Sequence, residues 1–253
     1  MASDGLAQAL EALPPGWWGQ YFDVVDSTQD EARAAARLGA PSRSIFVADY
    51  QRAGRGRQGR SWLAGPGDAL MLSIVFREFA DPPTPWRWTS LASVALAESI
   101  EEVLPALTPA IKWPNDVLLD DRKVAGILAE TTSDGHQLVA VVGIGVNVNS
   151  TSSELQRIGA PATSLRIAAG QPVDRAELFL TLLRRLDTWY ARPWPALHAA
   201  WQARLWGRGQ RLRLIDLGRE EDVVVLGAEL DGSLRIRLPD GTERHTTTGE
   251  LIP

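Results

Sequence analysis

Residues 51–62 read Gln51-Arg52-Ala53-Gly54-Arg55-Gly56-Arg57-Gln58-Gly59-Arg60-Ser61-Trp62. This stretch follows a predicted strand over 45–50 and contains the G-x-G-x-x-G spacing of dinucleotide-binding loops. A dinucleotide fold, however, requires a helix to begin at once, because the helix N-terminus must meet the pyrophosphate. The sequence instead continues through Leu63-Ala64-Gly65-Pro66-Gly67, which does not favour a helix. We therefore reject a Rossmann fold, and no Gly-Lys-Ser/Thr of a P-loop occurs in the chain.

The arginines of this stretch indicate a site for an anion. The glycines let the backbone fold closely over a ligand, and the guanidinium groups offer forked donors to phosphate or carboxylate. With Trp62 beyond them, a nucleotide is favoured, its phosphates on the guanidinium groups and its base against the indole. A solvated basic loop and a nucleic-acid-binding arm are the alternatives. Because nothing apolar holds the loop, we expect it to be disordered when empty and ordered by its ligand.

Length and composition limit the class of protein. A chain of 253 residues, 45% of them hydrophobic, can form one large domain or a main domain with a small appendage. The net charge of −5 argues against a global electrostatic grip on nucleic acid, and the absence of cysteine excludes disulfides and thiol catalysis. No apolar run approaches the roughly 20 residues of a membrane span, and the chain does not start with a secretory signal. We therefore expect a soluble, cytoplasmic protein.

Apolar periodicity predicts both strands and amphipathic helices. Ser27 is expected to cap a helix that stops at Gly39, with Asp30 as its partner in a capping box. After Gly207 the pattern changes to short strands joined by turns, which indicates a small all-β module. The predicted strands are 21–25, 45–50, 69–76, 117–119, 123–131, 137–148, 211–217, 223–230, 234–238 and 242–247, and the predicted helices are 4–12, 28–38, 87–104, 175–190 and 195–205.

A second cluster contains both lysines of the chain. Lys112 begins the run Lys112-Trp113-Pro114-Asn115-Asp116, and Lys123 follows on the far strand of a predicted hairpin. Only these two of the 26 lysines and arginines are lysines, which suggests a local need for a compact ammonium; chance is the alternative. Lys123 beside Asp116 would offer a cation to an anionic reactant and a carboxylate to a metal or an amine. An ordinary ion pair on an exposed hairpin is the competing interpretation.

A third motif is the strand end Val142-Gly143-Ile144-Gly145-Val146-Asn147. In a strand, Gly143, Gly145 and Asn147 share one face. Two missing side chains then leave space beside a polar group, as the wall of a pocket would. Glycines placed for packing alone are the alternative.

Together these motifs resemble those of the biotin protein ligases, also called biotin–[acetyl-CoA-carboxylase] ligases. The motifs are Asp26-Ser27-Thr28-Gln29, residues 51–62, Lys112-Trp113-Pro114-Asn115-Asp116, Arg122-Lys123-Val124-Ala125-Gly126-Ile127 and Gly143-Ile144-Gly145-Val146-Asn147, in that order. The resemblance implies an α+β fold, a mixed sheet flanked by helices as in class II aminoacyl-tRNA synthetases. It also implies a catalytic domain over 1–206 and a small SH3-like barrel over 207–253.

The family's reaction has two steps, both of which require charge neutralisation and alignment. Biotin and ATP form biotinyl-5′-AMP, and a lysine of a biotin carboxyl carrier domain of an acyl-CoA carboxylase then attacks it. The resemblance implies ATP and biotin as substrates, with Mg²⁺. From the sequence we also expect no DNA or membrane partner and a monomer when unliganded, with a weak dimer as the alternative.

The resemblance assigns roles to individual residues. Lys123, Arg55 and Asp116 are the expected catalytic residues, with Lys123 meeting the biotin carboxylate and the α-phosphate together. Gln29 stands where relatives often have Asn, so its role is the least defined. The expected biotin-binding residues are Ser27, Thr28, Gln29, Gln51, Gly54, Arg55, Gly56, Arg57, Lys123 and Gly126; the ATP-binding residues are Arg57, Arg60, Trp62, Lys112, Asn115, Asp116, Lys123 and Asn147; and Asp116 is the expected Mg²⁺ ligand.

Two other functions compete with this one. A lipoate–protein ligase shares the fold, but the Arg-plus-glycine run and the His-Asp pair of that branch do not occur here. A non-catalytic ligand sensor or nucleic-acid-binding protein would bind oligonucleotides with a steep salt dependence and release no pyrophosphate. Only about 20 residues precede the first predicted strand, which is too few for the helix-turn-helix of the repressor members, so we expect the monofunctional type.

Overall fold

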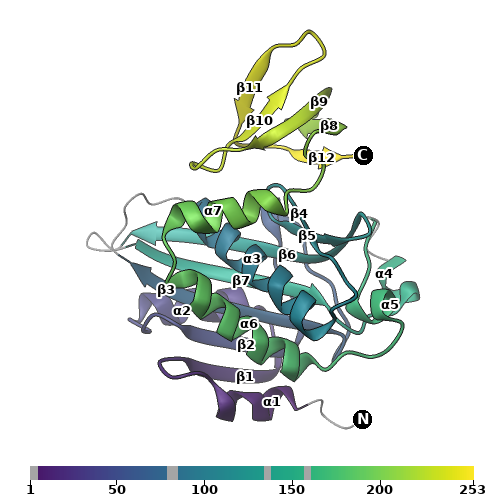
Figure 1. The fold of residues 1–253 in the computed structure, drawn as a ribbon. Helices are drawn as coiled ribbons and strands as arrows, with labels where there is room; N and C mark the ends of the chain where they lie inside the picture. Colours follow the sequence, from purple (N-terminus) through teal and green to yellow (C-terminus); the bar gives the residue numbers. More distant parts are fainter. Residues whose placement is uncertain (1–4, 79–84, 134–137, 157–160) are drawn as a thin grey trace.

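The chain folds around two β-sheets, which the computed structural model describes over residues 5–78, 85–133, 138–156 and 161–253 (Figure 1). The larger sheet has seven strands in the order β1-β2-β3-β7-β6-β5-β4, and the smaller has five in the order β11-β10-β9-β8-β12. In the larger sheet β1 runs parallel to β2, and the other neighbours pair antiparallel. Its strands are β1 (Trp18–Val25), β2 (Ser44–Gln51), β3 (Ala69–Glu78), β4 (Ala110–Lys112), β5 (Asp116–Leu119), β6 (Arg122–Ser133) and β7 (Leu138–Asn147). The predicted mixed sheet is therefore confirmed.

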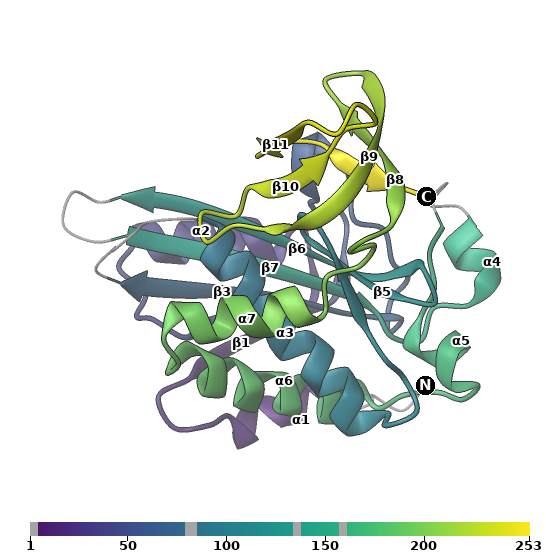
Figure 2. The same cartoon turned by 45° about the horizontal axis from the view of Figure 1, so that its top comes forward.

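Helices cover both faces of this sheet (Figure 2). On one face lie α3 (Pro85–Val103), α6 (Arg175–Tyr190) and α7 (Trp194–Ala203), and on the other lies α2 (Thr28–Arg37). Because successive side chains of a strand alternate between faces, Val142 packs toward α3 while Val141 packs toward α2. The short helical segments are α1 (Leu6–Ala9), η1 (Leu10–Ala12), η2 (Arg57–Gly59), α4 (Ser152–Leu155) and α5 (Leu165–Ala169).

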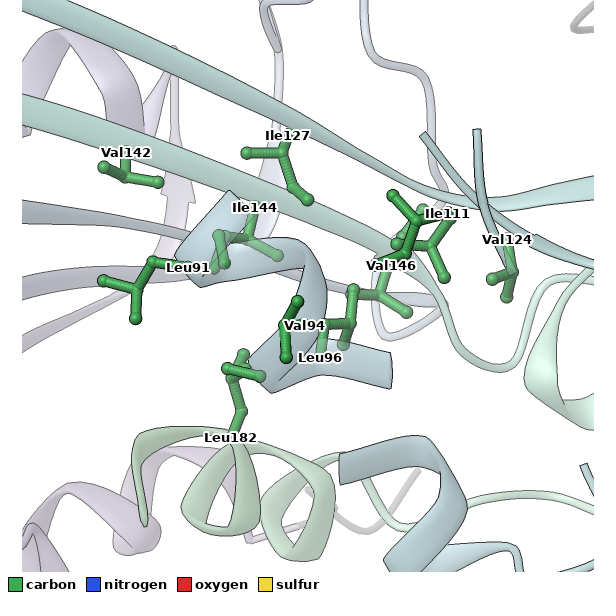
Figure 3. Close-up of a cluster of buried hydrophobic side chains, with 14 of the residues drawn as sticks. Leu91, Val94, Leu96, Ile111, Val124, Ile127, Val142, Ile144, Val146 and Leu182 are labelled. Carbon is green, nitrogen blue, oxygen red and sulfur yellow. The ribbon is translucent and has the colours of Figure 1, made fainter. Parts of the chain in front are cut away.

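The main core lies between the sheet and the α3–α6 layer. Figure 3 shows Leu91 and Val94 of α3 between the strand residue Ile144 and Leu182 of α6. Leu182 is fully buried, and α3 and α6 pack along much of their lengths. The predicted helix over 87–104 therefore packs its Leu91 and Val94 side chains between the sheet and α6.

Leu182→Ala is expected to lower the free energy of unfolding by about 2–5 kcal/mol, because it leaves a cavity between α3 and α6. Leu38→Ala provides the matched control, since Leu38 is 89% exposed, and its change should stay within about 0.5 kcal/mol. Urea unfolding followed by tryptophan fluorescence measures both. Equal effects of the two substitutions would contradict this account of the core.

The smaller sheet lies beside α7 and the β4–β5 turn (Figure 1). Its strands pair antiparallel, as expected for the SH3-like module. The Trp113 indole N–H donates to the Gly232 carbonyl oxygen at 3.0 Å, and the Gln202 amide exchanges two hydrogen bonds with the Ala228 backbone. The strands are β8 (Arg211–Asp216), β9 (Arg219–Ala228), β10 (Leu234–Arg237), β11 (Glu243–Thr246) and β12 (Glu250–Ile252). The sequence predicted four of them and missed β12.

The predicted capping box at the start of α2 is wrong. The Ser27 side chain makes no cap hydrogen bond, and the Thr28 backbone N–H donates instead to Gln51 Oε1 at 2.7 Å. Asp30 accepts a hydrogen bond from Arg55 of the glycine-rich loop. A distant glutamine therefore satisfies the helix end, which leaves the Ser27 hydroxyl available to a cavity described below.

Candidate functional site

A cavity of about 390 Å³ lies on the α2 face of the large sheet. Its floor includes Gly126 of β6 with Gly143 and Gly145 of β7. One wall is the start of α2, and the loop of residues 55–63 closes over the top. The predicted alternation along β7 is thus confirmed, because Gly143, Gly145 and Asn147 all line this cavity.

All but one of the expected catalytic, biotin-binding and ATP-binding residues line this cavity. The exception is Gly54, which is buried in the loop, where an added Cβ would lie 2.6 Å from the Trp62 carbonyl oxygen. The proposed residues that line the cavity are Ser27, Thr28, Gln29, Gln51, Arg55, Gly56, Arg57, Arg60, Trp62, Lys112, Asn115, Asp116, Lys123, Gly126 and Asn147.

Gly54→Ala is expected to raise about tenfold the Kd of biotin, the ligand that the resemblance implies, because the new Cβ meets backbone, which cannot move aside without reshaping the loop. Stability should change little, since the loop lies outside the core. Ala53→Ser, an exposed neighbour of similar size increment, is the matched control. Calorimetric titration with biotin measures the affinity, and an unchanged Kd in Gly54→Ala would contradict the close approach.

One end of the cavity is lined by uncharged polar groups. Thr28 Oγ1 lies 3.2 Å from Gln51 Oε1 and 2.9 Å from Ser73 Oγ, and Ser73 Oγ lies 3.0 Å from Gln29 Oε1. These three contacts cannot all be hydrogen bonds, because the Thr28 and Ser73 hydroxyls have only one proton each to donate. Because the Thr28 N–H already satisfies Gln51 Oε1, the Thr28 hydroxyl is free to point to Ser73 and to accept from a ligand. Ser27 Oγ is buried without a hydrogen-bond partner in the described part of the chain, so this end offers both donors and acceptors.

The other end of the cavity is cationic. Lys123 Nζ lies 2.7 Å from Asp116 Oδ1, across the β5–β6 hairpin that the sequence predicted. The Arg57 guanidinium donates to Asn115 Oδ1 at 2.9 Å, and burial lowers the pKa of Arg57 from its ordinary value. Lys112 Nζ lies 3.7 Å from Glu250 Oε1. An anionic reactant at this end would therefore meet Lys123, Arg57 and Lys112 together.

Trp62 lies over the glycine floor. A Cβ built on Gly145 would lie 2.6 Å from Trp62 Cε2, and one built on Gly126 would lie 3.3 Å from Trp62 Cζ3. The Lys123 ammonium is 6.0 Å from the centroid of the indole. Trp62 Nε1 and Asn147 Oδ1 are buried without hydrogen-bond partners among the described residues. Only a flat ring can lie this close to two strands, and only because both strands carry glycine there.

The small sheet contributes Glu250, which the sequence did not predict. Its carboxylate lies 2.8 Å from Arg60 Nη2, and Arg60's pKa is raised, chiefly by this hydrogen bond. Burial alone would raise the pKa of Glu250, but the Arg60 hydrogen bond and the Lys112 charge hold it below its ordinary value. Because the pKa of Glu250 is lower in the folded protein than in the unfolded chain, its ionised carboxylate stabilises the fold. This stabilisation is complete above the unfolded-state pKa and is lost as the pH falls through the folded-state pKa. The contact therefore weakens only in acid.

Arg55 points away from the cationic end. Its Nη1 donates to Asp30 Oδ1 at 2.6 Å, and its Nη2 lies 3.5 Å from Glu130 Oε1. The side chain thus ties the loop to α2 and β6. The loop has a closed conformation, in which Arg55 and Ser61 form an isolated antiparallel β-bridge. That the loop is disordered without its ligand stays a prediction.

The residues that the structure describes contain no cluster of three His, Asp or Glu side chains that could hold a metal alone. Asp116 and the unpartnered Asn147 Oδ1 are nevertheless oxygen donors that line the cavity. Mg²⁺ is commonly held by one or two carboxylates together with the phosphates of a substrate, so these residues fit such an ion. None of the helices in the described ranges has the length and apolar character needed to cross a bilayer.

The family to which this chain belongs follows from its similarity to known proteins. Residues 21–148 match the Biotin/lipoate A/B protein ligase family, and the chain belongs to this family. The biotin--[acetyl-CoA-carboxylase] ligase of Mycobacterium tuberculosis is 34% identical over 247 residues, which cover 93% of this chain and 89% of the relative.

Two further similarities agree with this assignment. The bifunctional ligase/repressor BirA of Bacillus subtilis is 32% identical over 230 residues, which cover 88% of this chain and 70% of the relative. The structure of the biotin protein ligase from Aquifex aeolicus in complex with biotin and ATP superposes with a TM-score of 0.76 at 27% identity. That similarity covers 92% of this chain and 97% of the other. The similarity to that structure therefore extends into the small C-terminal sheet.

Proposed function

We propose that the protein is an ATP-dependent biotin ligase that forms biotinyl-5′-AMP and transfers the biotinyl group to a lysine of a carrier domain of an acyl-CoA carboxylase. The observation that carries the proposal is that the two ends of the cavity beside α2 differ in polarity. Uncharged hydrogen-bonding groups around Ser27 and Thr28 line one end, and Lys123, Arg57 and Lys112 line the other. Biotin has the same polarity, with a neutral ureido ring at one end and a carboxylate at the other.

The uncharged end holds the ureido ring. Ser27 Oγ has a free donor and acceptor, and Thr28 Oγ1 retains lone pairs for a ureido N–H. The glycine floor leaves room for the chain that leads to the carboxylate. Buried polar groups that must be paired discriminate strongly against ligands that cannot pair them. Lipoate has no ureido group, so this end favours biotin over lipoate.

The cationic end supports adenylate formation. An oxygen of the biotin carboxylate attacks the α-phosphorus of ATP, the bond between that phosphorus and the bridging oxygen breaks, and pyrophosphate leaves with the electron pair. The Lys123 ammonium stabilises the negative charge on the carboxylate and α-phosphate as they approach, and Arg57 and Arg60 neutralise the phosphates. Trp62 packs against adenine. Mg²⁺, held by Asp116, Asn147 and the phosphates, would supply further charge neutralisation for the departing pyrophosphate.

The second step transfers the acyl group. The neutral amine of the carrier lysine attacks the acyl carbon, the bond from that carbon to the phosphate oxygen breaks, and AMP leaves. The amine loses a proton in this step, and we assign to Asp116, which pairs with Lys123, the role of orienting the amine or accepting that proton. The closed loop of residues 55–63 shields the adenylate from water until the carrier arrives.

Incubation of the purified protein with Mg-ATP and either biotin or lipoate tests the proposal. Mass analysis should detect biotinyl-AMP and matching pyrophosphate release with biotin, and much less product with lipoate. Pyrophosphate release with lipoate alone would favour a lipoate ligase, and none with either acid would favour a non-catalytic binding protein. The division at 206/207, the monomeric unliganded state, the absence of a DNA partner and the cytoplasmic location stay predictions.

A further inference from the structure

A line of hydrogen bonds runs from the uncharged end of the cavity to the protein surface. It passes from Thr28 Oγ1 to Ser73 Oγ at 2.9 Å, and from Ser73 Oγ to Gln29 Oε1 at 3.0 Å. Gln29 Nε2 then donates to Glu130 Oε2 at 2.9 Å. Thr28, Ser73 and Gln29 are all buried, whereas the Glu130 side chain reaches the surface. The line therefore joins the ligand-binding interior to a charged group outside it.

The Gln29 amide can have only one orientation. Its nitrogen faces Glu130 Oε2 and, at 3.2 Å, the Val141 carbonyl oxygen, and both of these groups only accept. The amide oxygen must then face Ser73, whose hydroxyl donates to it. Both hydrogens of this amide are used, and the residue is 3% exposed. Gln29 is therefore a fixed connector, and asparagine, one methylene shorter, would withdraw the amide from Glu130.

Glu130 connects this line to the loop. Its Oε1 lies 3.5 Å from Arg55 Nη2, and Arg55 Nη1 donates to Asp30 Oδ1 at 2.6 Å. Arg33 Nη1 lies 3.9 Å from Glu130 Oε2 and 3.6 Å from Asp30. Two carboxylates thus hold the Arg55 guanidinium, and one of them is itself held by Gln29. The Arg55–Asp30 contact is a charge-assisted hydrogen bond, which fixes geometry as well as contributing energy, and the Arg55–Glu130 contact at 3.5 Å is an ion pair.

We infer that Glu130 is a positioning residue that couples the ligand-binding wall to the loop over the cavity. Gln29 holds the carboxylate of Glu130, and that carboxylate holds Arg55 and with it the closed loop. The coupling rests on the proposed function, because the ligand whose binding it strengthens is biotin. It also gives Gln29 a role that depends on the length of its side chain, the point at which this sequence departs from the pattern that the resemblance implies.

Three variants test the coupling: Glu130→Gln, Gln29→Asn and the double variant. Glu102→Gln is the matched control, because Glu102 also pairs with arginines, has similar exposure and lies on α3 away from the cavity. Trypsin cleaves after the arginines of the loop, so the rate of loop cleavage, located by mass spectrometry, reports the tether with and without biotin. The dissociation rate of biotin and the single-turnover rate of adenylate formation at saturating biotin are measured on the same proteins.

Glu130→Gln and Gln29→Asn should each increase loop cleavage and biotin dissociation by about 3–10-fold. In Glu130→Gln the single-turnover rate should stay within about twofold of wild type, because Glu130 does not touch the reacting atoms. In the double variant, loop cleavage and biotin dissociation should be no faster than in Glu130→Gln, because both substitutions interrupt the same chain of contacts. Glu102→Gln should match wild type in every measurement.

Wild-type cleavage and dissociation rates in Glu130→Gln, or additive effects in the double variant, would overturn the coupling. Equal acceleration in Glu102→Gln would overturn it as well, because the effect would then be a general loss of stability. Faster loop cleavage in Glu130→Gln, in a chain that takes up no biotin, would support the tether and contradict the proposed function. The two failures are therefore distinguishable.

Discussion

Lys123→Arg is expected to lower the single-turnover rate of adenylate formation by about 10²–10³-fold. The substitution keeps the positive charge and changes only its shape. Lys123 Nζ lies 2.7 Å from Asp116 Oδ1, and a Cβ built on Gly126 would come within 3.2 Å of the same nitrogen. A planar guanidinium is wider than an ammonium and requires a different set of partners, so it does not fit this position.

Lys112→Arg is the informative comparison, because it changes the other lysine of the chain. Lys112 Nζ lies 3.7 Å from Glu250 Oε1 and 5.9 Å from the Trp206 ring centroid, a place where arginine can stack and pair. We expect a fall of less than about tenfold for this variant. Pyrophosphate release and mass analysis of biotinyl-AMP measure both variants, and thermal unfolding checks their stability. Adenylate formation near the wild-type rate in Lys123→Arg would refute the role of the ammonium.

The predictable part of the molecule was encoded in local patterns. Alternation along β7 placed Gly143, Gly145 and Asn147 on one face, and they line one cavity. The predicted strands 117–119 and 123–131 form the hairpin that brings Lys123 to Asp116, and its turn residues Asp120 and Asp121 have positive φ. In each case the periodicity of one strand, or the chemistry of one turn, was sufficient to decide the arrangement.

The remaining features depend on contacts between distant parts of the chain. The N-terminus of α2 uses Gln51 in place of Ser27, although serine is a preferred cap, because tertiary contact overrides local preference there. Strand β12 has only three residues, too few to show alternation, so its residue Glu250 was not expected beside Arg60. Ser73 did give a signal that was overlooked, as a lone polar residue within the apolar run of β3. Such a residue needs a buried partner.

Gly145→Val is expected to lower the rate of adenylate formation by about 100-fold at subsaturating ATP, while leaving the fold intact. A Cβ at this position would lie 2.6–2.9 Å from three atoms of the Trp62 ring, so valine must displace the indole from the floor of the cavity. The ring belongs to a loop rather than to the core, and valine suits a strand, so the free energy of unfolding should change by less than about 1 kcal/mol. The displaced indole would lie in the space that adenine requires.

A Trp62→Ala background separates this clash from other effects of valine. Removal of the indole weakens ATP binding by itself, because a stacking partner of the base is lost. In that background, however, Gly145→Val should add less than about threefold, since the added methyl groups no longer meet a ring. ATP titrations of the four proteins, with adenylate measured by mass, complete the cycle. If the effects of the two substitutions on the rate of adenylate formation simply multiply, the role of Gly145 is not to accommodate Trp62. The glycine floor would then need another explanation.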